Sequence, residues 1–385
     1  MKNLTRLLFT AGLSVLLVCC EKANVNSDLV SEKDEMLSAI AENFLDNTVF
    51  PTYKTLADNT QLLHEQLQSI NSQEDLNLAT QTFLLARQWW ELSEAFLFGA
   101  ASDFGIDPHI DSWPLDVDGF KDLMNSPAIL ERLAAEDGDI YAGSKLGNDL
   151  LGFHGIEYIL FDPSGVKKAK DWTTISESEY AYSIAVSGDL RNRTAQLDAA
   201  WRGEASGERL SMVEDELELP VTVGGGDFHY GENLFAAGQP GSTFRSWTHA
   251  AQSILQAAAD IADEVGTSKI GKAHSGEDPT YIESPYSKNS IADFYDNIIS
   301  IQNVYFGGID SQRDESRSFH AFFSKYDEDT DAVITEAIDN ALNAVSSMKA
   351  PFVDNISDPS CDTAMEACAR LVDALEEAVQ RIPQL

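Results

Sequence analysis

Apolar residues recur every three or four positions along most of the chain, which is the period of an α-helix with one buried face. The pattern runs through residues 29–45, is closed by Pro51, and resumes over residues 56–70. No stretch of the sequence alternates polar and apolar residues in the way that a half-buried strand does. The sequence therefore predicts an all-α protein.

The predicted helices fall into two sets. The first set covers about residues 29–45, 56–70, Asp75 to Phe98, 119–135, the stretch around 151–161, and 173–201. The second set covers about residues 244–265, 289–306, 317–348 with an interruption near Tyr326, and 361–381, with a polar loop from Gly266 to Ser287. Residues 203–243 lie between the sets and contain Gly224-Gly225-Gly226, which is typical of a connecting segment. Long helices with short links form antiparallel bundles, so we expect an N-terminal helical bundle over residues 35–202 and a C-terminal one over residues 244–385.

Two short segments of the chain resemble each other. Glu94-Ala-Phe-Leu-Phe-Gly99 ends one predicted helix, and Gln302-Asn-Val-Tyr-Phe-Gly307 ends another. A match of this length also arises by chance, but it agrees with two halves of similar helix content. We therefore expect a pseudo-duplicated architecture.

The N-terminus has the pattern of an export signal. Lys2 and Arg6 precede an apolar segment, residues 7–18, that is too short to span a bilayer as a permanent helix. The segment ends in two cysteines, so residues 1–20 are predicted to be a lipoprotein signal with Cys20 as the lipidated residue and residues 21–34 as a tether. The alternatives are a simple secretory signal and an uncleaved anchor. A lipid on Cys20 would hold the protein on a membrane of a bacterial cell envelope, at the outer membrane or the periplasmic face.

The chain is strongly acidic, with 26 Lys and Arg against 63 Asp and Glu and a formal net charge of −37. Such a field repels nucleic acid and anionic lipid headgroups, and it concentrates cations near the surface. We therefore expect no nucleic-acid partner. Solubility accounts for most of these charges, so acidity alone does not identify a metal-binding protein.

Cys361 and Cys368 are the only other thiols of the chain once the signal is removed. Within one helix their Cα atoms would lie about 10.5 Å apart, because a helix rises 1.5 Å per residue. A disulfide requires less than about 7 Å. The exported compartment permits a bridge if Cys361 lies in the loop before the helix, so the sequence leaves the pairing open.

His154 and Glu157 are the most informative pair of residues, because they lie three apart inside the apolar run 151–161. On a helix this spacing points both side chains to the same side. Burying ionisable groups among Leu, Ile, Tyr and Phe is costly unless each one finds a partner. The partner is either a bound cation or an internal ion pair.

A second polar stripe is predicted on the apolar helix that ends near Phe98. Arg87, Glu91 and Glu94 are spaced four and then three residues apart, so they share one face. If this stripe meets the His154 stripe, Arg87 is the only nearby positive charge that we expect. The remaining negative charge then requires a proton or a bound cation. The simpler alternative is an Arg87–Glu91 pair beside a His154–Glu157 pair, with no metal.

Neighbouring residues are expected to complete the site. Asp111 lies in a loop rich in Gly, Asp and Pro and is predicted to lean into the same space, with Trp113 lining it. Gly152 removes side-chain bulk and allows a neighbouring segment to approach closely.

Oxygen ligands with one nitrogen suit iron, manganese, zinc or calcium, and no thiolate is nearby to favour a softer metal. The sequence contains no Walker-type loop, Gly-x-Ser-x-Gly elbow or His-Glu-x-x-His helix.

These residues resemble the imelysin-like family, whose diagnostic feature is Gly-x-His-x-x-Glu, here Gly152, His154 and Glu157. The likeness spans roughly residues 35–380 and includes four more segments: Arg87-x-x-Trp-Glu-x-x-Glu-Ala-Phe-x-Phe-Gly99, Ile110-Asp-Ser-Trp-Pro-Leu-Asp116, Gly266-Thr-Ser-Lys-Ile270, and Glu283-Ser-Pro-Tyr-Ser-x-Asn-Ser290 with Asp293 after it. The resemblance implies two helical-bundle halves with the motif near their interface. It also implies an exported, often lipid-anchored protein that is linked to iron uptake and its partner proteins.

The resemblance leaves two functions to weigh. In the favoured one the protein binds a divalent or ferric metal ion, iron first and zinc as the alternative, through the following ligands: His154, Glu157, Glu91, Glu94 and Asp111. In the other the protein is a metallopeptidase that uses His154 and Glu157, since the family was first described as a peptidase. Hydrolysis needs an open coordination position and a general base. The motif supplies two ligands but no obvious base, so we favour binding.

Overall fold

The computed structural model describes residues 20–385, with side chains from residue 32 onward. The predicted signal segment, residues 1–19, and the side chain of Cys20 lie outside the described residues. The predicted tether, residues 21–34, forms part of the first helix, α1 (Cys20–Phe44). Within the described part of the chain, no helix combines the length and the apolar character that crossing a membrane requires.

The first part of the chain forms long helices linked by short ones. They are α1, α2 (Phe50–Leu67), α3 (Gln73–Glu91), α4 (Ala100–Asp103), α5 (Asp107–Ile110), α6 (Val117–Met124), α7 (Pro127–Leu133), α8 (Gly138–Lys145), α9 (Gly152–Leu160) and α10 (Glu177–Arg202). Ser72 and Ser176 cap α3 and α10 by accepting hydrogen bonds from backbone N–H groups in the first turn. The connecting segment adds α11 (Glu208–Ser211) and α12 (Tyr230–Phe235).

The remainder of the chain is also helical. Its helices are α13 (Trp247–Asp263), α14 (Gly271–Ser275), α15 (Ser290–Phe306), α16 (Phe319–Tyr326), α17 (Glu328–Ser346) and α18 (Ser360–Arg381). Among the described residues there is no strand, only an isolated bridge between Phe161 and Ala169. The all-α prediction is therefore confirmed, whereas the pseudo-duplication stays a prediction.

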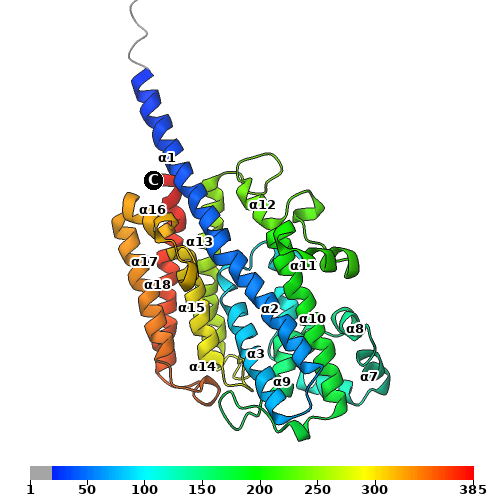
Figure 1. The fold of residues 1–385 in the computed structure, drawn as a ribbon. Helices are drawn as coiled ribbons and strands as arrows, with labels where there is room; N and C mark the ends of the chain where they lie inside the picture. The colour runs from blue at the N-terminus through cyan, green and yellow to red at the C-terminus, as the bar shows by residue number, and fades with distance from the viewer. Residues whose placement is uncertain (1–19) are drawn as a thin grey trace, which may run out of the picture.

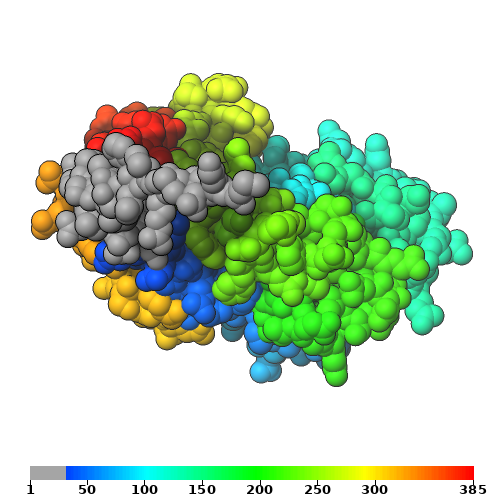
Figure 2. Space-filling view, turned by 90° about the horizontal axis from the view of Figure 1, so that it is seen from above, coloured from blue at the N-terminus to red at the C-terminus, as the bar shows by residue number. Residues whose placement is uncertain are grey.

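The long helices pack into two groups. α2 packs against α3 and α10, while α13 and α17 pack against α18 and α15. In Figure 1 the yellow to red helices of the second group lie on the left and α2, α3 and α10 on the right. Seen from above, orange and red atoms gather at one end of the molecule, and cyan to green atoms at the other (Figure 2). α1 packs on α13 and α16, and α3 packs on α15. Helices from the first and the second half of the chain therefore contact each other between the two groups.

Two helix boundaries differ from the sequence prediction. The helix expected to reach Phe98 ends at Glu91, and Glu94–Phe96 forms a separate 3₁₀ turn. The helical ladder breaks at Ser93, whose backbone N–H bonds to Trp90 O at 2.8 Å, and the backbone N–H of Ala95 then donates to the Ser300 hydroxyl at 3.1 Å.

The polar loop expected to begin at Gly266 is the second difference. The chain instead continues from α13 through a π-helical turn, Glu264–Ile270, into α14. Gly266 allows this turn to lie against α18, where a Cβ at residue 266 would approach the Cβ of Cys368 to 3.0 Å. The prediction missed the turn because its i→i+5 bonds leave no periodic signal in the sequence.

The two cysteines of α18 are free thiols in the structure, and both are buried. Cys361 is already the second residue of the helix, so the loop position that a disulfide needs is not realised. Burial raises the pKa of the Cys368 thiol to about 12. Both thiols therefore pack as small apolar groups.

Candidate metal centre

Arg87 lies at the centre of a buried ionic cluster. Its position on α3 places the guanidinium against three carboxylates from different parts of the chain: Glu91 one turn later, Asp111 at the end of α5, and Glu283 before α15. The side chain is fully buried, and its guanidinium carbon also lies 5.2 Å from the ring centre of Phe153. A planar guanidinium with five donors suits such a shared position better than an ammonium group would.

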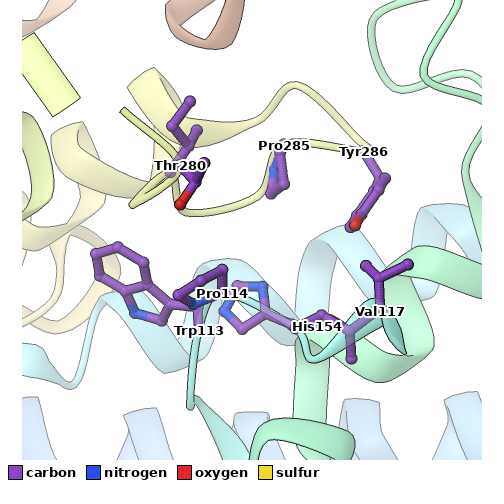
Figure 3. A pocket seen from close by; sticks show the side chains of 9 residues that line it. Trp113, Pro114, Val117, His154, Thr280, Pro285 and Tyr286 are labelled. Carbon is purple, nitrogen blue, oxygen red and sulfur yellow. The ribbon is translucent and has the colours of Figure 1, made fainter. Parts of the chain in front are cut away.

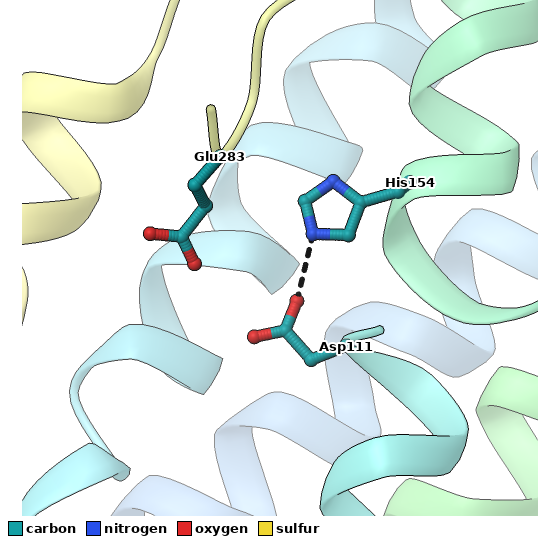
Figure 4. A group of neighbouring side chains, drawn as sticks. All are labelled: Asp111, His154 and Glu283. Atoms are coloured by element: carbon teal, nitrogen blue, oxygen red, sulfur yellow. Dashed lines mark hydrogen bonds and ion pairs between the residues drawn. The ribbon is translucent and has the colours of Figure 1, made fainter. Parts of the chain in front are cut away.

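Asp111 links this cluster to the histidine of the Gly-x-His-x-x-Glu motif. One carboxylate oxygen accepts from the indole N–H of Trp90 at 2.6 Å, and the other lies 3.1 Å from His154 Nε2. Figure 4 shows that Asp111 and His154 come from neighbouring helices, with Glu283 facing them from an opposite loop. Burial alone would raise the pKa of Asp111, but the charges of Arg87 and His154 hold it below its usual value.

The position of His154 depends on how α9 begins. Gly152 is the first residue of this helix and has φ +63°, a conformation that side chains with a Cβ rarely adopt. A Cβ there would overlap the backbone of Ile110. The glycine therefore allows α9 to start directly against the end of α5, which brings His154 within reach of Asp111.

Replacing Gly152 by Ala should disturb this contact. A Cβ in the left-handed region costs about 1–2 kcal/mol, and the overlap with Ile110 adds a further 1–3 kcal/mol. We expect the free energy of unfolding, measured with urea, to fall by about 2–5 kcal/mol. Gly105→Ala is a matched control, since Gly105 also has positive φ but a Cβ there meets nothing within 4 Å. Equal losses in the two variants would contradict this account of Gly152.

Glu157 lies one turn after His154 and has a different set of partners. Its Oε2 is 3.5 Å from His154 Nδ1. Its Oε1 accepts from the backbone N–H of Tyr286 at 3.1 Å and from both the backbone N–H and the hydroxyl of Ser287 at 2.7 Å. Glu157 thus ties α9 to the loop before α15 and orients the imidazole at the same time.

The other two predicted carboxylates also lie in the cluster, but they face a second cation. Glu91 Oε2 accepts from Asn297 at 2.6 Å and lies 3.5 Å from Lys269 Nζ. Glu94 lies 3.8 Å from the same ammonium group. The expectation that Arg87 is the only nearby positive charge is therefore wrong, because the π-helical turn after α13 carries buried Lys269 into the cluster.

Sequence reasoning missed four residues of the cluster: Lys269, Glu283, Asp293 and Asn297. Glu283 accepts from Lys269 at 3.1 Å as well as from Arg87, and Asp293 is buried beside it on α15. A signal for three of them was present, since Lys269, Glu283 and Asp293 lie in segments that carry the family resemblance. Only their assignment to the site was missing.

The cluster contains more carboxylates than permanent cations. Six carboxylates, Glu91, Glu94, Asp111, Glu157, Glu283 and Asp293, surround Arg87 and Lys269. Burial raises the pKa of Glu94 and Asp293 well above the usual value, and it raises that of Glu283 to about 7. Burial would lower the pKa of His154, but hydrogen bonds to Asp111 and Glu157 raise it to about 9. Bound protons thus offset part of the negative charge when no metal is present.

Two groups of side chains have the spacing that a metal ion requires. In Asp111, His154 and Glu283, one ligand atom of each residue lies within 4.8 Å of the others, and the same holds for Glu91, Glu94 and Asp111. Bonds of 2.0–2.2 Å place donor atoms about 3–4.4 Å apart, so a small contraction would close either group around an ion. Glu283 Oε2 is buried and has no hydrogen-bond partner among residues 20–385.

A cavity of about 340 Å³ adjoins His154 (Figure 3). Trp113, Pro114 and His154 lie on one side of it, and Thr280, Pro285 and Tyr286 on the other. The structure thus places Trp113 beside the site, on the cavity wall. It brings the remaining predicted residues into one cluster: Arg87, Glu91, Glu94, Asp111, Gly152, His154 and Glu157.

Comparisons with known proteins identify the family and the fold of the chain. The family model for imelysin matches residues 49–381. Iron-regulated protein A of Synechococcus elongatus is 26% identical over 354 residues, which are 89% of this chain and 86% of that protein. A crystal structure assigned as an iron-regulated protein A precursor of Parabacteroides distasonis has a TM-score of 0.76 and 27% identity, covering 91% of this chain and 95% of that one. An imelysin-like protein of Psychrobacter arcticum shares the fold at a TM-score of 0.59 and 14% identity, over 89% and 93% of the two chains. With the family model matched over most of its length, this chain belongs to the imelysin family.

Proposed function

We propose that this protein binds a metal ion at the buried cluster and serves iron acquisition at the cell envelope. Asp111, His154 and Glu283 are the favoured ligands, since their donor atoms converge within 4.8 Å. Glu91 and Glu94 form a neighbouring set that shares Asp111. The observation that carries the proposal is the excess of buried carboxylates over Arg87 and Lys269.

The donor chemistry supports a transition metal. Carboxylate oxygens with a single imidazole nitrogen suit iron or zinc, and neither free cysteine belongs to the site. The unpartnered Glu283 Oε2 is an oxygen whose burial is costly unless a cation or a proton joins it. Glu157 acts in this proposal as the residue that orients His154, because its Oε1 already accepts from Tyr286 and Ser287 and its Oε2 faces His154 Nδ1.

Iron is favoured because two relatives of similar length carry the name iron-regulated protein A. An export signal with a lipid on Cys20 would place the site outside the cytoplasm, where a cell captures metal. Partner proteins of an iron-uptake system would then receive the ion. Zinc stays the alternative cargo, since it accepts the same ligands.

Calorimetric titration of metal-stripped protein with ferrous iron, under exclusion of oxygen, tests the proposal. We expect one ion per chain and a release of protons on binding, because His154 and the carboxyl groups whose pKa is raised by burial must lose their protons when the ion binds. His154→Ala and Asp111→Asn should each weaken binding by about 100-fold or more. His229→Ala is the matched control, since His229 and Glu232 have the same spacing and lie 3.1 Å apart, but outside the cluster.

Equal iron uptake by wild type and by His154→Ala protein would show that the site lies elsewhere. Metal analysis of protein purified without nickel affinity would then identify the ion and its amount. Tight binding of zinc together with weak binding of iron would support the proposed site but identify zinc as the ion that it binds.

Peptide hydrolysis is the second candidate function, and one observation favours it. In that reading Asp111 and His154 would hold the metal, and Glu283, with its pKa raised to about 7 by burial, would serve as the general base for a metal-bound water instead of as a ligand. The cavity beside His154 is small for an extended peptide, so we favour binding. Metal-dependent cleavage of a peptide library that is lost in Glu283→Gln protein, with metal still bound, would establish the peptidase instead.

A further inference from the structure

We propose that the cavity beside His154 takes a planar organic group with anionic oxygens, so that the metal reaches the site as an organic chelate. This inference rests on the proposed metal-binding function and names the form of its cargo. It is carried by the composition of the cavity walls, which do not suit a hydrated ion.

The walls consist mainly of carbon. Two irregular segments face each other across the cavity, and the lining side chains are Trp113, Pro114, Leu115, Val117, His154, Thr280, Ile282, Pro285 and Tyr286. Of these only Trp113, His154, Thr280 and Tyr286 carry a polar side-chain atom, and none of the four is a carboxylate. A hydrated cation would find few oxygens here to replace its water, whereas an organic group gains free energy by burying its apolar surface.

The shape of the walls favours a flat ring. The rings of Trp113, His154 and Tyr286 lie on the cavity walls. Outside the lining, the Tyr281 ring packs on Trp113 with centroids 3.9 Å apart, and Lys272 Nζ lies 4.1 Å from the Tyr281 centroid. Aromatic rings on the walls stack on planar groups, and the oxygens with which an organic group chelates a hard metal ion are anionic. A volume of about 340 Å³ is at the small end of pockets for organic ligands, which limits the group to one or two rings.

His154 connects the cavity with the ligand group. Of Asp111, His154 and Glu283, only the histidine lines the cavity, and the two carboxylates lie behind it. A chelate in the cavity would therefore present its metal to the imidazole first. Its carbon skeleton would stay against the apolar walls.

The test uses 2,3-dihydroxybenzoate, an aromatic chelator, as its ferric complex. Ferric citrate serves as the aliphatic comparison and ferrous iron as the free ion. Calorimetry and tryptophan fluorescence should show that the aromatic complex binds at least tenfold more tightly than ferric citrate. Val117→Phe, which fills the cavity, should weaken the aromatic complex by about tenfold or more and leave ferrous iron within twofold of wild type.

Val166→Phe is the matched control, because the same substitution there falls on an exposed valine outside the cavity. Trp113→Ala should act like Val117→Phe, and Trp113→Phe should restore part of the binding. If ferrous iron binds but the aromatic complex behaves like ferric citrate, or ignores Val117→Phe, the chelate inference is wrong and the metal site stands. If the wild-type protein binds none of the three, that is, the aromatic complex, ferric citrate and ferrous iron, then the proposed function fails and the inference fails with it.

Discussion

Replacing Arg87 by Met should lower the free energy of unfolding of the metal-free protein by about 3–5 kcal/mol. The substitution keeps most of the side-chain volume but leaves Glu91, Asp111 and Glu283 without the cation that they share. Removing one partner of a buried ion pair costs this much because the remaining charge stays out of water. Urea unfolding followed by circular dichroism measures the loss.

The matched control is Arg132→Met. Arg132 pairs with Asp137 at 2.7 Å, but both side chains are about half exposed, so we expect a loss within about 1 kcal/mol. A loss of that small size in Arg87→Met would show that the carboxylates are neutral or hydrated in solution.

The effect of Arg87→Met should also depend on pH. Burial raises the pKa of Asp111, but the charges of Arg87 and His154 outweigh this effect and hold the pKa below its usual value. A carboxyl group with a lowered folded-state pKa contributes stability above its unfolded pKa near 4, and this contribution is lost as pH falls further. The difference between wild type and Arg87→Met should therefore narrow below about pH 4.

Replacing Lys269 by Met should have two opposite consequences. Without metal, the free energy of unfolding should fall by about 3–5 kcal/mol, because Glu91, Glu94 and Glu283 lose a buried cation. With metal, the same loss of positive charge should tighten binding of a divalent cation by about tenfold. At 100 times the dissociation constant, bound metal should restore about 2.7 kcal/mol.

Lys121→Met is the control for this variant, since Lys121 pairs with Asp118 on the exposed surface. It should change neither stability nor metal affinity appreciably. Weaker metal binding by Lys269→Met than by wild type would mean that Lys269 supports the site instead of competing with the ion. Thermal unfolding with and without metal separates these outcomes.

The helical architecture was predictable because apolar residues recur at the helix period along almost the whole chain. The Arg87–Glu91 spacing and the His154–Glu157 spacing predicted which helix faces carry the polar groups. In the structure Asp111 joins the two faces, because it contacts both Arg87 and His154. Glu94 joined them even though its helix ends earlier, at Glu91, because the 3₁₀ turn that follows keeps its side chain near Lys269.

The site residues that come from the second half of the chain were not predictable from the local sequence pattern. Lys269 meets Glu91 across 178 residues, and Glu283 meets Arg87 across 196 residues. Both lie in a segment without a helical apolar stripe, so periodicity gave no orientation for their side chains. The pair His229 and Glu232 shows the converse, since its spacing equals that of His154 and Glu157, yet it lies outside the cluster and the Glu232 side chain is 58% exposed.

The contact between Glu157 and residues 286–287 has a consequence for the order of events during synthesis. A ribosome that has made only the first 200 residues has produced Asp111 and His154 but neither Lys269 nor Glu283. The group of Asp111, His154 and Glu283 is therefore incomplete until the final third of the polypeptide emerges and docks. Under the proposed function, a nascent chain would offer a metal ion only Glu91, Glu94 and Asp111, and the group that contains the histidine would form in the mature molecule alone.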